Sequence, residues 1–138
     1  MNKNIISVLK GGIIATAAMT LLMLVAAPMM GMPEMPIGKM LAGFMGIPVA
    51  MGWVMHFVIG IILAGGYVFV GKNLMPGNDI VKGLAFSLIP FLIAQVAVMP
   101  MMGAGLFSAN TPMPMMMVMG SLIGHLVYGG VLGTTAKS

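Results

Sequence analysis

The sequence predicts an all-α integral membrane protein, a four-helix bundle built from a duplicated two-helix hairpin. Composition is the first observation: the 138 residues are 60% hydrophobic and 6% charged, with a mean hydropathy of +1.12. A water-soluble domain of this size could not bury so much apolar surface. The second observation is an internal repeat, which predicts that one pair of helices occurs twice.

Long uncharged stretches locate the helices, because about 20 apolar residues suffice for one helical span. No charged residue occurs within 11–33, 40–71 or 83–136. The last stretch is long enough for two spans, and its glycine, small polar and proline residues at 103–112 predict a turn. Barrel strands are a poor alternative, since lipid-facing strands alternate in polarity and these stretches do not. We expect helices near residues 6–30, 47–71, 81–102 and 114–135, and a short interfacial helix around Lys39 to Met45.

The two halves of the chain share matching residues in the same order. Lys10-Gly11 and Pro28-Met29-Met30-Gly31 recur 72 residues later as Lys82-Gly83 and Pro100-Met101-Met102-Gly103, and His56 with Gly60 recurs 69 residues later as His125 with Gly129. Each half, 1–72 or 73–138, contains two spans, so both copies cross the membrane in the same sense. We expect a pseudo-twofold axis along the membrane normal and a single transmembrane domain over 1–138.

The lysines predict the orientation. With an even number of spans, both termini and the loop near 71–82 lie on one side, which carries five lysines and one aspartate, while the other side carries Lys39 and Glu34. The positive-inside rule therefore places both termini in the cytoplasm, and we expect the bacterial cytoplasmic (inner) membrane. Nucleic-acid binding is not expected, because no basic stripe is interleaved with aromatic residues. Cleavage of a signal peptide over 1–27 is disfavoured, since it would remove a helix that the second copy retains.

Two histidines within the predicted spans are the strongest functional lead. His56 and His125 occupy equivalent positions well inside the hydrocarbon, where ionisable groups are costly and tend to be functional. Small residues recur every four positions on the same helix faces: Gly52, Gly60 and Ala64 around His56, and Ser121, Gly129 and Gly133 around His125. Such a stripe is typical of a helix-packing seam. It also leaves room for a flat ligand, which makes Gly60 and Gly129 candidate cofactor-binding residues.

A second interpretation is that His56 and His125 face each other and bind a metal or a haem. Haem b would take two axial imidazoles, although the chain has no arginine for its propionates. Copper is favoured by the 20 methionines, many of them near the outer helix ends, because thioethers select Cu(I) and imidazole also suits copper. Methionine is equally a flexible apolar filler, so simple packing is an alternative explanation of the cluster.

The other polar residues within the spans are assigned simpler roles. Gln95 lies at a depth close to the histidines and could hydrogen-bond one of them or a backbone group. Thr16 and Thr20 are expected to bond back to their own helix, and Tyr128 needs a partner for its hydroxyl. Tyr67 is expected to anchor the inner interface.

Short motifs along nearly the whole chain match one family. They are Lys10-Gly11-Gly12, the Trp-x-x-His motif at Trp53 and His56, Met99-Pro100, and the His-x-x-Tyr-Gly motif from His125 to Gly129. On these residues the sequence resembles an uncharacterised family of small bacterial four-span membrane proteins, a domain of unknown function. The resemblance implies the four-span topology and the positions of the two histidine motifs, and it implies no activity.

The motifs of soluble enzymes are missing. The sequence has no phosphate-binding loop and no Gly-x-Ser-x-Gly elbow, and Glu34 and Asp79 fall on opposite sides of the membrane. We therefore expect no enzymatic activity. The prediction is an accessory or structural subunit that contacts the lipid bilayer and associates with itself or with another membrane protein. The alternative is a binding protein or carrier for copper or haem b at the paired histidines.

Overall fold

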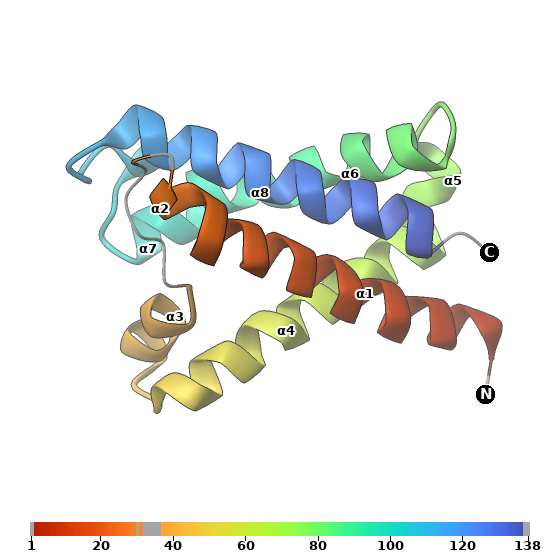
Figure 1. Cartoon of the computed structure of the whole chain (residues 1–138), viewed down its shortest axis with the longest axis horizontal. Coiled ribbons are helices and arrows are strands. Elements are labelled where there is room, and N and C mark those ends of the chain that lie inside the picture. The colour runs from red at the N-terminus through yellow and green to blue at the C-terminus, as the bar shows by residue number, and fades with distance from the viewer. Residues whose placement is uncertain (1, 30, 32–36, 137–138) are drawn as a thin grey trace.

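A computed structural model describes residues 2–29, 31 and 37–136. Within these residues four helices are long and apolar enough to cross a membrane, and they pack together (Figure 1): Lys3–Ala26, Val49–Leu74, Asp79–Met101 and Pro114–Thr135. The predicted all-α fold and its four spans are confirmed, so this is a multi-pass membrane protein. Glu34 and Lys137, which enter the charge comparison above, lie outside the described residues.

Three of the four spans are interrupted by a π-helical segment. The first consists of α1 (Lys3–Leu21), the segment Leu22–Ala26 and α2 (Ala27–Met29); the second of α4 (Val49–Gly66), Tyr67–Gly71 and α5 (Lys72–Leu74); the third of α6 (Asp79–Ile93), Ala94–Val98 and α7 (Met99–Met101). The fourth is the uninterrupted α8 (Pro114–Thr135). Single π-helical turns are frequent at functional sites, and no feature of the sequence had predicted them.

Two short elements fill the loops at one end of the bundle. The predicted short helix is present as α3 (Ile37–Met45), which packs against α4. The contact is close because Gly52 of α4 lies against the carbonyl oxygen of Gly38, where a Cβ atom would collide. The predicted turn between the last two spans contains one 3-10 turn, Leu106–Ser108.

Asparagine side chains cap the first and third spans. The side-chain oxygen of Asn2 accepts from the backbone N–H of Asn4 at 2.8 Å, and that of Asn78 accepts from Val81 at 3.0 Å. Asp79 follows in the first turn of α6, where its negative charge interacts favourably with the helix dipole. These residues therefore define where α1 and α6 begin.

The chain runs up and down four times. The Lys3 end of α1, the Thr135 end of α8 and the turn between α5 and α6 lie at one end of the bundle, whereas α2, α3 and α7 lie at the other (Figure 1). Helix α1 packs on both α4 and α8, and α6 packs along α8. Among the described residues, α4 and α6 have few contacts apart from the π-helical segment that follows α4. A cavity between them is lined by residues of both helices, among them Gly60 and Pro90.

Small residues close the hairpin of α1 and α4. A Cβ atom on Gly60 would collide with the Thr16 hydroxyl, and one on Gly12 would lie 2.8 Å from the Ile61 Cα and 3.2 Å from the Ala64 Cβ. The predicted helix-packing seam is therefore confirmed in the first half of the chain.

The hairpin of α6 and α8 is closed in a similar way. A Cβ atom on Gly129 would collide with the carbonyl oxygen of Gly83 and lie 2.6 Å from the Ser87 Cβ, and one on Gly83 would lie 2.9 Å from the Gly133 Cα. Backbones at this separation can interact through many van der Waals contacts. The second seam is confirmed as well.

The main apolar cluster includes Tyr67, Phe86 and Leu132. Tyr67 is 1% exposed and meets the Phe86 ring edge-on, with centroids 5.4 Å apart. The prediction that Tyr67 anchors an interface is therefore wrong. The reason is that the segment beginning at Tyr67 packs against both α1 and α6, which places the ring in the apolar cluster.

Candidate functional site

Two adjacent cavities lie between the spans, and His56 and His125 line both of them. The smaller has a volume of about 90 Å³. The larger, about 230 Å³, extends past Thr16, Gly60 and Tyr128. Helix α4 supplies His56 and α8 supplies His125, so the fold brings the two predicted residues to one place inside the bundle.

The ring of His125 is held by its own helix. Its Nδ1 lies 2.7 Å from the carbonyl oxygen of Ser121, and because a carbonyl can only accept, Nδ1 carries the proton in the neutral ring. Nε2 is left with its lone pair, and no described residue hydrogen-bonds that atom. Phe91 meets the ring edge-on at 5.9 Å. Donation from one ring nitrogen to a backbone carbonyl is a common setting for a metal-binding histidine.

The ring of His56 is held from the neighbouring helix. Thr20 donates its hydroxyl proton to the carbonyl oxygen of Thr16 at 2.6 Å, and His56 Nε2 lies 3.0 Å from the same hydroxyl oxygen. Since that hydroxyl has one proton, Nε2 is the donor to it. Nδ1 of His56 is then the nitrogen with the free lone pair. Trp53 and Phe57 pack edge-on against the ring at 5.9 and 5.8 Å.

Methionines make up much of the wall of the smaller cavity. Five line it: Met19, Met23, Met40, Met99 and Met102. The Met23 sulfur lies 3.3 Å from the position that a Cβ of Gly124 would occupy, so the absence of a side chain there admits this thioether beside His125. Methionine side chains thus extend from one end of the helix bundle inward to the two imidazoles.

Met19 and Met23 could have been found from the sequence. They are four residues apart and each lies three residues after a threonine, Thr16 or Thr20, so these residues share one face of the first span. Sequence reasoning had considered only the methionines nearer the helix ends. The pairing of Thr20 with His56, 36 residues away, leaves no local signal and needed the tertiary structure.

Gln95 lines the smaller cavity from the third span and is 1% exposed. It accepts a hydrogen bond of 3.0 Å from the hydroxyl of Ser108, which is itself fully buried. The expectation that Gln95 bonds a histidine or a backbone group is therefore wrong, because the 3-10 turn brings Ser108 over it. Phe107 and Ser108 have positive φ angles of 50° and 58°, so the turn that seats Ser108 is strained.

The two threonines of α1 behave differently. Thr20 bonds back to its own helix, as predicted. The hydroxyl oxygen of Thr16 does not; within the described residues it is the one buried side-chain polar atom without a hydrogen-bond partner. It faces Gly60 where α1 crosses α4. The hydroxyl of Tyr128 has a hydrogen-bond partner, as expected, and the structure shows that this partner is the carbonyl oxygen of Gly60.

The two glycines predicted to make room for a cofactor lie in different surroundings. Gly60 lines the larger cavity. Gly129 is not among the residues that line either cavity, and its open side is filled by Gly83 and Ser87. A role for either glycine in cofactor binding stays a prediction.

Four apolar spans around a cavity lined by the buried His56 and the partly buried His125 define a small multi-pass membrane protein. The chain belongs to the family described as "Family of unknown function (DUF6789)", whose model matches residues 1–138. The predicted resemblance to an uncharacterised family is confirmed at this level. No curated protein matches the chain. No solved structure matches it either.

Proposed function

We propose that the protein binds a soft monovalent cation, with Cu(I) as the physiological example, between His56 and His125. One observation carries the proposal: two imidazoles, each with one ring nitrogen anchored and the other free, share a cavity whose wall contains five methionines. A free imidazole nitrogen and a thioether sulfur both donate an electron pair without bringing a charge into the membrane. Soft cations are the metals that such ligands select.

The wall of the cavity argues against hard cations. Calcium and magnesium require several oxygen ligands, and no group of three His, Cys, Asp or Glu that could hold a metal occurs in the described part of the chain. A cation bound here would complete its coordination with methionine sulfur. Two imidazoles with one or two thioethers would give a trigonal or tetrahedral site, so few ligands are needed.

Haem b suits the site less well. The cavities of about 90 and 230 Å³ are smaller than the roughly 300–1,000 Å³ that sites for drug-sized ligands occupy. The chain also has no arginine to pair with propionates.

Metal analysis of protein purified in mild detergent under reducing conditions tests the proposal. We expect one Cu(I) per chain after loading and gel filtration, and loss of that copper in both His56→Leu and His125→Leu, because either change removes one of two imidazole ligands. Leu126→Ala, next to His125 on α8 but outside both cavity linings, is the matched control and should retain the metal. Binding should weaken as the pH falls, since protons compete for the same ring nitrogens. Copper retained in both histidine variants would contradict the proposal.

The second candidate is an accessory or structural subunit without enzymatic activity, docked to itself or to another membrane protein. It is favoured by the small share of the molecule outside the four spans. The same experiment separates the two candidates. A wild-type chain that binds no soft cation but co-purifies with one defined partner would support the subunit.

The two hairpins also look like related copies, and we include their duplication in the proposal. Gly60 meets Thr16 and Gly129 meets Ser87; His56 meets Thr20 and His125 meets Phe91. The partners on the first helices are 71 residues apart, and those on the second helices are 69 apart. Equivalent contacts at constant offsets support a pseudo-twofold relation between residues 1–72 and 73–138.

The proposed orientation puts both termini in the cytoplasm of a bacterial cell, with the methionine-rich end outside. Two reporters fused after Ser138 test this orientation. A reporter that works only in the cytoplasm should be active, and a reporter that works only outside the cell should be inactive. The opposite pattern would reverse the assignment.

A further inference from the structure

Methionine is distributed very unevenly along the spans. All but two of the 20 methionines fall within residues 19–55 and 99–119, and the exceptions are Met1 and Met75. Leucine, isoleucine and valine occur at both ends of the helices. If methionine were only an apolar filler, it would follow the same distribution.

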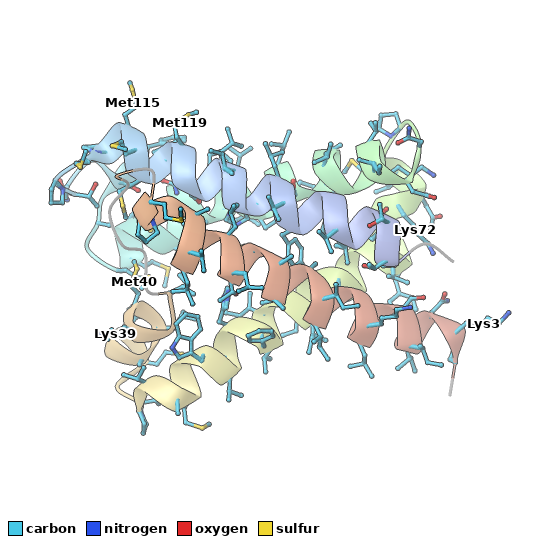
Figure 2. All side chains as sticks on the ribbon, viewed as in Figure 1. Lys3, Lys39, Met40, Lys72, Met115 and Met119 are labelled. Atoms are coloured by element: carbon cyan, nitrogen blue, oxygen red, sulfur yellow. The ribbon has the colours of Figure 1, made fainter. Side chains whose placement is uncertain are left out.

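The structure places this methionine-rich half at one end of the bundle. Met40, Met115 and Met119 lie at the end opposite Lys3 and Lys72 (Figure 2). On α4 and α8 the histidines lie on the inner side of the methionines, because α8 contains no methionine after Met119 and α4 none after Met55. The thioethers therefore lie between the imidazoles and one surface of the molecule.

Exposure falls along a series of these methionines toward the cavity. On the segment from α7 to α8, Met115 is 80% and Met101 67% exposed, and Met113 and Met119 are also exposed. Met102, the neighbour of Met101, is partly buried and lines the smaller cavity. Met99 is 5% exposed and lines the cavity too.

We infer that these methionines form an entry route, along which the soft cation passes by thioether exchange from the surface of the α7 to α8 segment to the site between His56 and His125. The inference rests on the proposed function and adds its direction: the cation enters from the methionine-rich end. The surface stations are Met101, Met113, Met115 and Met119, and Met102 and Met99 are the inner ones.

Thioethers are better suited to passing a soft cation on than to retaining it. A single neutral sulfur holds a soft cation weakly, so it exchanges readily, and several weak sites in series let an ion enter and still move on. The imidazoles at the end of the series are stronger donors and would retain the cation. The opposite end of the bundle, with its lysines, would repel a cation and offers Met75 as its one thioether in the described residues.

The single tryptophan makes the arrival of a cation visible. Trp53 lines the smaller cavity and its ring centroid lies 5.9 Å from that of His56. Ag⁺ is a soft monovalent cation that needs no reductant and quenches indole fluorescence at short range. Stopped-flow mixing of Ag⁺ with the protein in lipid nanodiscs therefore reports loading of the histidine site itself.

The test replaces the four surface stations by leucine, in the variant Met101→Leu, Met113→Leu, Met115→Leu and Met119→Leu. We expect quenching at limiting Ag⁺ to slow by about tenfold, within the range over which mutations change association rates, while the equilibrium titration stays the same. The matched control is Met45→Leu with Met51→Leu, which removes two exposed methionines of α3 and α4 at the same end. The control should load at the wild-type rate.

Each other outcome overturns the route. An unchanged loading rate in the variant with four leucines would contradict the entry route. Equal slowing in the control would contradict it too, because it would indicate a general property of exposed methionine. Loss of equilibrium binding in the four-fold variant would make these residues ligands instead. Wild-type protein that shows no quenching and no bound silver would overturn the proposed function together with the route.

Discussion

The two histidines differ in how their rings are held. His125 donates to the backbone carbonyl of Ser121 one turn away in its own helix, whereas His56 depends on the Thr20 side chain of a neighbouring helix. A backbone carbonyl in a helix moves little. A substitution at Thr20 can therefore change the orientation of the His56 ring, whereas no side-chain substitution removes the carbonyl that holds the His125 ring.

Thr20→Val should loosen the His56 ring and weaken Ag⁺ binding by about 10- to 100-fold, the usual effect of removing a residue that orients a metal ligand. Valine keeps the volume and the apolar contacts, so unfolding by dodecyl sulfate should change little. Thr134→Val is the control, because Thr134 bonds only the carbonyl of its own helix at Val131 among the described residues. Equal affinities in both variants would show that Thr20 does not position the ligand.

At the scale of single elements, the spans were predictable and their interruptions were not. Charge-free stretches and the glycine and proline residues near 103–112 located four helices to within a few residues, and α3 was anticipated at Lys39 to Met45. The π-helical segments were not predictable, because the apolar sequence continues through them without a local signal. Two of them contain Tyr67 and Gln95, the two residues for which the sequence predicted other surroundings.

The glycine seams offer a sharp test of the packing. Gly129→Ala would place a methyl group against the backbone of Gly83 and should destabilise the fold by about 1–3 kcal/mol, as overpacking does. The adjacent Gly130 meets only the flexible Leu84 side chain at 3.6 Å, so Gly130→Ala should be neutral or gain up to about 1 kcal/mol from helix propensity. Unfolding followed by Trp53 fluorescence measures both. Similar values for the two variants would contradict the seam.

At the scale of the whole molecule, the two hairpins are joined through α1 and α8 and, among the described residues, by one side-chain hydrogen bond. The Tyr128 hydroxyl donates to the Gly60 carbonyl, 68 residues earlier, and both residues line the larger cavity. The sequence predicted that the histidines occupy equivalent places but not which helices would touch. That choice depends on side-chain fit between the halves, and α4 and α6 stay apart while α1 and α8 meet.

Tyr128→Phe removes the bond between the hairpins and should lower stability by about 0.5–1.5 kcal/mol, the usual net value of a buried hydrogen bond. Tyr67→Phe is the matched control, since Tyr67 is likewise buried, 1% exposed as a whole residue, and no hydrogen bond among the described residues links its hydroxyl to the other hairpin. It should change stability little. If Tyr67→Phe were the more damaging variant, the bond would not be what holds the halves together.

X-ray absorption at the copper edge of the Cu(I)-loaded protein tests the central claim most directly, because it identifies the atoms bound to the metal. The site between His56 and His125 predicts a shell of imidazole nitrogen with its outer-ring scattering, together with a longer shell of sulfur from methionine. The nitrogen shell should lose amplitude in His125→Leu. A spectrum with sulfur alone, or with oxygen in place of imidazole nitrogen, would contradict the paired-histidine site.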